Sequence, residues 1–500
     1  MKSLRDRYKD LLAIEDWGVR PMSQAANELA MLIDSAAKLG EVGGLERAIQ
    51  VCALLRERRP TEVIAALLYY FEANAWAAQK PIPLPGVAGG WDWQNDAVER
   101  EFLLLRFAKQ HAGFAKLSGL RKSQIFTNLA NALDTLGRHV EALAIYDEAL
   151  GHDPQHHMAR GNRGICLFHV TLNLAEQPHE LGLCPLVDYL RAANSALEAP
   201  EPVFRDYREK LERITHSCEH ESSVKDREEV RQPWTKAEDS YRRWCLKHRL
   251  FLNPMNDIRT EAIIASDPLH IQSLVTAVGE NPYVLRWFNQ LKQEFSLARV
   301  LLHEGTEEKP LHFSDRGVSL IDLQDETEYS VAVEKTKTAL RIAYSQFDKI
   351  GFLLNHYLEL KIELRKIGFR TLWFEGQQRE KGLRQEFVDR ENLPLRGLYW
   401  LSRDIAARGD ATLALDPDAR DLVEIRNHAE HKFLHVHANG GGPLLADQSN
   451  GPVRSVSRPE LEAYALRMLK LVRSALLYLA HAINVEEEER RKGWRTRYSS

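Results

Sequence analysis

Hydrophobic residues recur at helical spacing along most of this 500-residue chain. In residues 285–304, 335–368 and 458–483, apolar side chains recur three and four positions apart. This spacing places them on one face of an α-helix. We find no convincing alternation of apolar and polar residues of the kind that indicates strands. The pattern predicts an all-α protein, with a helical repeat domain followed by a helical bundle.

The N-terminal third of the chain repeats a helix-pair pattern. In residues 128–154, Gly137 falls where two helices would turn, and Ala142 and Ala149 fall where they would pack closely. This arrangement resembles a tetratricopeptide repeat. Small residues and prolines continue the spacing elsewhere, at Gly43, Ala48, Pro60 and Gly164. Because such arrays build concave peptide-binding surfaces, we expect a protein or peptide ligand on this region.

Breaks in the helical pattern divide the chain into segments. Residues 81–93 are rich in proline and glycine and predict an inserted loop. Residues 217–234 are polar and indicate a domain boundary, after which residues 240–258 predict an ordered connector. We therefore predict a repeat domain at 1–216, a connector at 217–282, a bundle at 283–485 and a charged tail at 486–500.

Composition narrows the function classes. The formal net charge is −4, which excludes a generally basic nucleic-acid-binding protein, so any RNA site must be a local patch. The five cysteines include no CxxC pair, which argues against a zinc ribbon or a disulfide framework and for a reducing compartment. The charged N-terminus lacks the apolar core of a signal peptide, and no apolar run approaches bilayer length. We expect a cytoplasmic protein without a membrane partner.

The most informative stretch lies within residues 421–436, where apolar spacing predicts one helix. It contains Arg426 and Asn427, followed by His431. A guanidinium is a permanent forked donor for phosphate oxygens. An imidazole can take or give a proton near neutral pH. These residue types together suit RNA cleavage without a metal.

Three interpretations of this helix remain open. On this helix, four residues form one polar stripe: Glu424, His428, His431 and His435. The first interpretation is a solvated helix face without a function. The second is a metal site built from the same histidines and His437, but no HExxH pattern is present and no cysteine lies nearby. The third is an RNA-cleaving site, and we therefore expect neither a metal nor another cofactor.

The spacing of Arg426 and His431 matches the R-x4-6-H motif of the HEPN superfamily, in which a polar residue such as Asn427 often follows the arginine. The segments YRRWCLKHRLFLNPMNDI and FDKIGFLLN resemble segments of a bacterial HEPN branch that also carries tetratricopeptide-like repeats. The resemblance implies a C-terminal bundle of four or five helices. It also implies a metal-independent endoribonuclease.

The resemblance further implies how the residues would act. His431 would serve as general base or acid, Arg426 would stabilise charge on the phosphoryl oxygens, and Asn427 would position the phosphate or the imidazole. The products would carry 2′,3′-cyclic phosphate and 5′-OH ends. From the helical stripe alone, we add Glu424, His428 and His435 as auxiliary or RNA-binding residues.

The family also implies partners and a setting. The partner would be RNA, with tRNA as one candidate, and the chain would form a homodimer through its C-terminal bundle. The apolar surface of residues 458–483, which exceeds what a one-sided helix requires, supports this dimer. The setting would be bacterial stress or anti-phage defence, as a toxin-like nuclease. The alternative is a non-catalytic protein that binds partners or nucleotides.

Two residues outside the motif also suggest a role. Asp348 and Lys349, in a predicted helix, could reach the motif helix across the bundle. A buried ion pair between structural residues is the competing interpretation.

Overall fold

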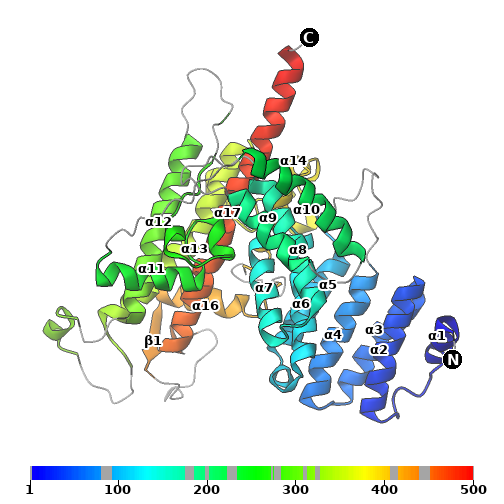
Figure 1. Ribbon diagram of the computed structural model, residues 1–500. Helices are drawn as coiled ribbons and strands as arrows, with labels where there is room; N and C mark the ends of the chain where they lie inside the picture. Colours follow the sequence, from blue (N-terminus) through cyan, green and yellow to red (C-terminus); the bar gives the residue numbers. More distant parts are fainter. Residues whose placement is uncertain are drawn as a thin grey trace. The chain divides into compact units, whose positions relative to one another are not determined.

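A computed structural model of the chain describes residues 3–79, 93–174, 185–197, 202–221, 234–271, 274, 283–307, 312–320, 327–405, 415–438 and 451–498. Within these ranges it contains seventeen α-helices, several 3₁₀ turns and two short strands (Figure 1). The predicted all-α class is confirmed. The predicted loop at residues 81–93 lies, except for Trp93, outside the described residues.

The chain divides into two compact units. The first comprises Met1–His169, Ala193–Glu212 and Leu415–Pro417, and the second comprises Val170–Ala192, Arg213–Ala414 and Asp418–Ser500. The helices α8, α9 and α10 cross the division. The helices up to α10 are α1 (Leu4–Leu12), α2 (Met22–Leu39), α3 (Val42–Glu57), α4 (Glu62–Ala78), α5 (Asp96–Gln110), α6 (Gly119–Thr135), α7 (His139–His152), α8 (His157–Leu174), α9 (Pro185–Ala196) and α10 (Pro202–Glu221).

In the first unit, helices that follow one another in sequence pack against one another from α1 to α7. The pair α6–α7 shows why. Gly137 has a φ of 81°, a left-handed conformation that glycine adopts without strain, so the chain can reverse between the two helices. Ala142 and Ala149 are fully buried where α7 packs. This stacking has the form expected of helical repeats, and their assignment as tetratricopeptide repeats stays a prediction.

The earlier helix pair turns at a different residue from the one that the spacing suggests. Gly40, with a φ of 69°, ends α2, whereas Gly43 lies in the first turn of α3. Gly44 lies so close to Tyr8 that any side chain at this position would overlap the tyrosine ring. Gly44 therefore serves helix packing, whereas a Cβ at Gly43 would meet no atom within 4 Å. The spacing from Gly43 did not locate the turn.

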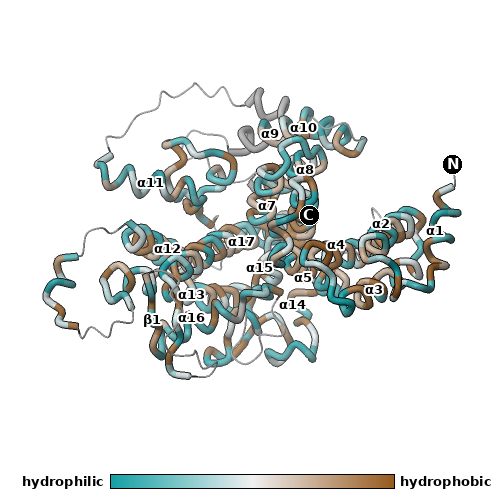
Figure 2. The backbone as a smooth tube through the Cα atoms, turned by 90° about the horizontal axis from the view of Figure 1, so that it is seen from below, coloured by the Kyte–Doolittle hydropathy of each residue, from teal (hydrophilic) through white to brown (hydrophobic). Residues whose placement is uncertain are grey.

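The second unit is built on long helices that share one apolar core. Its helices after α10 are α11 (Lys236–His248), α12 (Tyr283–Glu307), α13 (Val331–Tyr357), α14 (Gln385–Val388), α15 (Leu393–Ser402), α16 (Ala419–His431) and α17 (Arg458–Tyr498). Helices α12, α13 and α17 pack on one another, with α15 against α17 and α16 against α13. Figure 2 shows hydrophobic and hydrophilic residues alternating along these helices, as the sequence pattern predicts.

Helix α13 is shorter than the predicted stretch 335–368. It ends at Tyr357, and Glu359 and Lys361 follow with positive φ angles. Asn355 holds this turn, because its backbone carbonyl accepts from the Leu360 N–H at 3.0 Å and its side-chain oxygen accepts from the Ile362 N–H at 2.9 Å. The apolar spacing beyond Tyr357 therefore belongs to an irregular segment that packs on the bundle.

Helix α17 is the central helix of this unit. It continues without a break through the charged residues 486–492 to Tyr498. By length and composition alone this helix could cross a membrane, contrary to the expectation from the sequence, but 83% of its most apolar window is buried inside the structure. Such burial is typical of the core helix of a soluble protein.

The connector that includes residues 240–258 is folded and is fixed to the bundle by two buried arginines. Arg473 of α17 donates to Asp257 at 2.7 Å, and both side chains are almost fully buried. Arg299 of α12 pairs with Asp267 at 2.7 Å and also donates to the Leu250 carbonyl at 2.9 Å. Buried charges are tolerated only when they are paired and hydrogen-bonded, as they are here. This segment therefore has a structural role.

The two strands were not anticipated. β1 (Phe433–His437) pairs in parallel with β2 (Val453–Ser457), with Val436 opposite Val456. Consequently the prediction of one helix over residues 421–436 is wrong in its last part, because α16 ends at His431. Lys432 is already extended, with φ −139° and ψ −158°. Backbone pairing with a strand that comes later in sequence ends the helix, and local apolar spacing does not reveal it.

Candidate active site on helix α16

Helix α16 is fixed on two sides before it reaches the motif. Its apolar face buries Leu422, Val423 and Ile425. Its acidic residues pair with arginines outside the helix. Asp418 accepts from Arg467 of α17 at 2.7 Å, and Asp421 accepts from Arg454 of β2 at 3.0 Å. The second half of the helix, which carries the motif, is thus held in a defined orientation.

Arg426 is half-buried and faces α13. Its guanidinium lies over the ring of Tyr344, 4.9 Å from the ring centroid. One terminal nitrogen donates to the side-chain oxygen of Asn427 at 3.1 Å. The Nε–H is enclosed and has no acceptor among the described residues. A cation–π contact of this kind contributes about 0.5–2 kcal/mol and fixes the plane of the guanidinium. The arginine is therefore oriented and keeps donors for an anionic ligand.

His431 is the last residue of α16, and it is exposed. Within the part of the chain that the structure describes, its imidazole has no hydrogen bond or ion pair. An α-helix rises about 7.5 Å over the five positions from Arg426, and these two residues project about 140° apart around the axis. The structure thus brings Arg426 and Asn427 together but leaves His431 apart from them within one chain.

The auxiliary candidates Glu424 and His428 serve to hold the helix. The carboxylate of Glu424 pairs with Arg454, next to the Asp421 pair. His428 is buried, and its Nδ1–H donates to the backbone carbonyl of Glu424 at 2.7 Å. Its Nε2 lies 3.4 Å from the carbonyl oxygen of Gly451. The backbone carbonyl of Glu424 therefore orients His428, whereas the Glu424 carboxylate pairs with Arg454.

His435 does not lie on the helical stripe. It is half-buried in the middle of β1, opposite Ser455 of β2. The predicted stripe from Glu424 to His435 is therefore wrong at its last member, because the chain has left the helix. The structure gives His435 no contact with Arg426, Asn427 or His431.

With this geometry in place, comparisons with known proteins are informative. Residues 275–486 match the model of the LA2681-like HEPN family. The C-terminal region of this chain is a HEPN domain. The resemblance inferred from the motif and its flanking segments is confirmed for this region. No curated protein and no solved structure matches the chain.

Among the described residues of the HEPN domain, the histidines near the motif do not lie together as a group that could hold a metal ion. His428 is oriented by a backbone carbonyl, His437 is buried in β1, and His431 is exposed at the helix end. Of the residues that the structure describes, the group that could hold a metal ion lies elsewhere, at Asp134, His139 and Cys166.

Sequence analysis missed Tyr344 and only partly anticipated Asp348. Both lie on α13, four residues apart and so on the same face. Burial raises the pKa of the Asp348 carboxyl, although the charge of Arg426 acts to lower it. Lys349 instead pairs with Glu294 at 2.5 Å. The spacing of Tyr344 and Asp348 was a visible signal, but only the packing of α13 on α16 shows that this face meets Arg426.

The apolar surface of α17 is explained largely within one chain of the HEPN domain. Nearly all the residues that suggested a partner surface are buried, among them Leu461, Ala465, Met468, Leu469, Val472, Ala475, Leu476 and Leu479. Tyr464 and Leu471 are half-buried. The surface of α17 therefore gives little support to a dimer, and any support must come from the motif itself.

Proposed function

We propose that this protein is a metal-independent endoribonuclease of the HEPN type. The observation that carries the proposal is the position of the complete motif in a HEPN domain. Arg426 is oriented by Tyr344 and Asn427, and His431 is exposed at the end of the same helix. The combination provides a fixed cation for the phosphate and an accessible imidazole for the proton. The general HEPN assignment and the residue types support this function.

In the proposed reaction, an imidazole takes the proton of the ribose 2′-OH. The 2′-oxygen attacks the adjacent phosphorus, and the bond from phosphorus to the 5′-oxygen breaks. The leaving 5′-oxygen receives a proton from a protonated imidazole. Arg426 stabilises the negative charge that builds on the phosphoryl oxygens, and Asn427 keeps the guanidinium in place. The products are a 2′,3′-cyclic phosphate and a 5′-OH.

This chemistry benefits from two copies of α16. One exposed His431 cannot act as base and acid at the same moment, and it projects away from Arg426 of its own helix. A second chain, facing the first with its own α16, would supply the complementary imidazole and guanidinium. We therefore propose a homodimer whose composite cleft holds the RNA.

Two neighbours of His431 suit an RNA substrate. Phe433 is 66% exposed at the start of β1, which is unusual for a large aromatic side chain. Aromatic rings of this kind stack on unpaired bases, so a single-stranded region such as a tRNA loop is the proposed target. Lys432, also exposed, adds a positive charge beside it. The proposed setting is bacterial stress or anti-phage defence in the cytoplasm, with the N-terminal repeats sensing a partner.

The test is to incubate the purified full chain with total RNA and with tRNA in EDTA, and to determine the chemistry of the new ends. The expected products carry 2′,3′-cyclic phosphate and 5′-OH ends, and the His431→Ala protein yields none. Cleavage that persists at the wild-type rate in His431→Ala would show a contaminating or unrelated nuclease. RNA binding without cleavage by the wild type would instead favour the non-catalytic alternative.

A further inference from the structure

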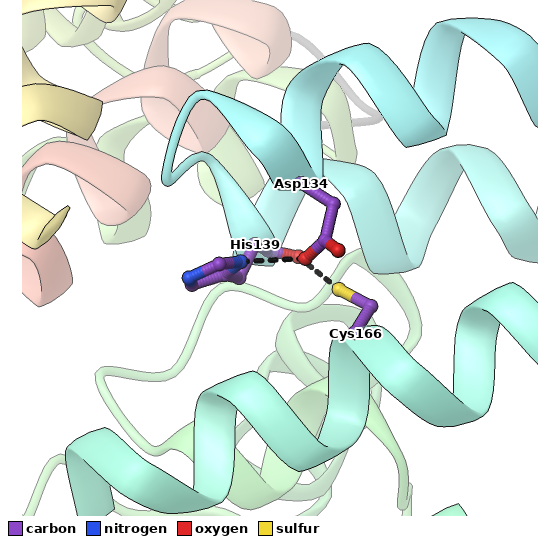
Figure 3. Close-up of side chains that lie close together, drawn as sticks. All are labelled: Asp134, His139 and Cys166. Carbon is purple, nitrogen blue, oxygen red and sulfur yellow. Dashed lines mark hydrogen bonds and ion pairs between the residues drawn. The ribbon is translucent and has the colours of Figure 1, made fainter. Parts of the chain in front are cut away.

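We propose that the first unit contains a structural site for a transition-metal ion, with Zn²⁺ as the best fit. The ligands are Asp134, His139, Cys166 and His169. They are contributed by three helices, α6, α7 and α8, near the turn that Gly137 makes. Figure 3 shows Asp134, His139 and Cys166 converging between these helices. This site is separate from the motif of the HEPN domain and does not depend on the proposed ribonuclease function.

The distances between the donor atoms suit one ion. Oδ1 of Asp134 lies 2.7 Å from Nδ1 of His139, and Oδ2 lies 3.1 Å from Nδ1 of His169. Donor atoms of Asp134, His139 and Cys166 all fall within 4.8 Å of one another. Donors around a tetrahedral Zn²⁺ are separated by roughly 3.3–3.8 Å. The donor atoms of Asp134, His139 and Cys166 are therefore close to the spacing that one ion needs, and His169 reaches the second oxygen of the same carboxylate.

The two imidazoles already take the arrangement that a shared ion requires. The rings of His139 and His169 have their centroids 5.7 Å apart and are inclined by 46°. Both direct Nδ1 at the same carboxylate. A metal ion at that place would replace the two protons that now lie between the imidazoles and Asp134. The Nε2 of His139 is buried without a partner among the described residues, and it is the atom that would carry the proton if Nδ1 bound an ion.

Burial and the types of ligand favour an ion over a chance cluster. Cys166 is fully buried and His139 is 3% exposed, so these ligands are closed off from water, as in structural zinc sites. The carboxylate of Asp134 offers the ion a hard oxygen ligand. The cysteine sulfur supplies the soft ligand that selects zinc over magnesium or calcium.

The sequence carries a matching signal. Cys166 and His169 are three residues apart on α8, which places them on the same helix face. Asp134 and His139 lie five apart across the turn between α6 and α7. The sequence contains no CxxC pair, but Cys166 and His169 form a Cys-x2-His pair. One ion would fasten three helices at a single point, and this would stabilise the repeat region where it turns.

The experiment measures metal content in the full chain, purified without a metal-affinity resin. Variants at two ligands, Cys166→Ala and His169→Ala, are compared with Cys52→Ala. Cys52 is also a fully buried cysteine, on α3, and it lies outside the cluster. Elemental analysis is expected to find about one zinc ion per chain in the wild type and in Cys52→Ala, and almost none in the two ligand variants. Because His169 keeps partial exposure, its variant tests the site even if Cys166→Ala fails to fold.

Cobalt provides a second readout that does not depend on enzyme activity. The chain is stripped with a chelator, desalted and titrated with Co²⁺. The wild type is expected to develop the near-ultraviolet absorption of a cobalt–thiolate bond, and Cys166→Ala to lose it. A folded wild-type chain that carries no transition metal and shows no cobalt–thiolate absorption would overturn the proposal. The four side chains would then form only a hydrogen-bonded network. A cobalt–thiolate band that survives in Cys166→Ala would also overturn it.

Discussion

Histidines gather in two regions of this molecule, and the regions differ in every respect that matters for chemistry. On α6–α8, His139 and His169 share a buried carboxylate with a cysteine close by. On α16, His431 is exposed and has no partner in the described structure. A buried imidazole with fixed partners is suited to holding a structure or an ion. An exposed imidazole on the same helix as an oriented arginine is suited to moving protons on a bound substrate.

His428 sharpens this comparison because it lies on the same helix as His431. It is buried, and its Nδ1–H is committed to a backbone carbonyl. Three residues along one helix therefore separate a structural histidine from a candidate catalytic one. Residue type and proximity to the motif do not distinguish them, but accessibility and hydrogen bonding do.

The largest expected effect is the loss of cleavage in His431→Ala. Removing a general acid–base group costs about 10²–10⁴-fold in rate. The side chain is exposed and has no hydrogen bond or ion pair with the described residues, so the midpoint of thermal unfolding is expected to stay unchanged. Cleavage rates are measured on a fluorescently labelled tRNA, and stability by circular dichroism. His435→Ala, a histidine of β1 that does not contact the motif, is the matched control and is expected to cleave RNA normally.

The next effect concerns the arginine of the same region. Arg426→Lys keeps the positive charge but loses the planar fork that reaches two oxygens, and it loses the stacking on Tyr344. We expect cleavage to fall by about 10²–10³-fold, the cost of removing one preorganised donor to a developing charge. Single-turnover kinetics separates this effect from weaker RNA binding. A variant with near-normal rates would show that Arg426 supplies charge alone.

His428→Ala tests the structural side of the comparison. It removes a buried hydrogen bond and leaves a small cavity, so the free energy of unfolding of the HEPN domain is expected to fall by about 1–3 kcal/mol. Below the unfolding transition, the cleavage rate per folded molecule is expected to stay near that of the wild type. Urea denaturation followed by tryptophan fluorescence gives the stability. A large loss of rate in a variant of normal stability would move His428 into the active site.

The sequence was sufficient for some of these features because they are local. The apolar spacing of residues 421–436 predicts a helix, which α16 forms as far as His431, and the spacing of Arg426 and His431 indicates the HEPN family. The end of that helix was not predictable, because it depends on the pairing of Phe433–His437 with Val453–Ser457. The aromatic partner of Arg426 comes from α13, and the burial of His428 depends in part on Gly451. These contacts join residues far apart in sequence.

The buried cluster shows the same limit. Cys166 and His169 were recognisable as a pair on one helix face, because their spacing is local. These two residues come close to Asp134 and His139 only because α8 packs on the turn between α6 and α7. The spacing of apolar residues in the sequence does not reveal this packing. Likewise, the apolar face of α17 indicated a buried helix correctly. It could not show whether the same chain or a partner covers that face.

A smaller effect is expected when active and inactive subunits are mixed. If two copies of α16 build one cleft that needs both imidazoles, an equal mixture of wild type and His431→Ala retains about a quarter of the activity, because only one dimer in four is fully wild type. Independent sites would retain half. The subunits are mixed under conditions that allow exchange, and light scattering reports the dimer. A monomer that cleaves at full specific activity would defeat the composite site and leave the ribonuclease assignment in place.

The smallest expected effect is that of a chelator on cleavage, and it separates the two histidine regions most cleanly. EDTA is expected to leave the initial rate of RNA cleavage unchanged, because the reaction proposed for His431 uses no metal. The same treatment is expected to lower the midpoint of thermal unfolding of the wild type, since an ion that binds only the folded chain stabilises it by mass action. Cys166→Ala, which lacks one ligand, is expected to show no such decrease. Inhibition of cleavage within the first minutes, before any unfolding is detected, would place a metal at α16 and reverse the roles of the two regions.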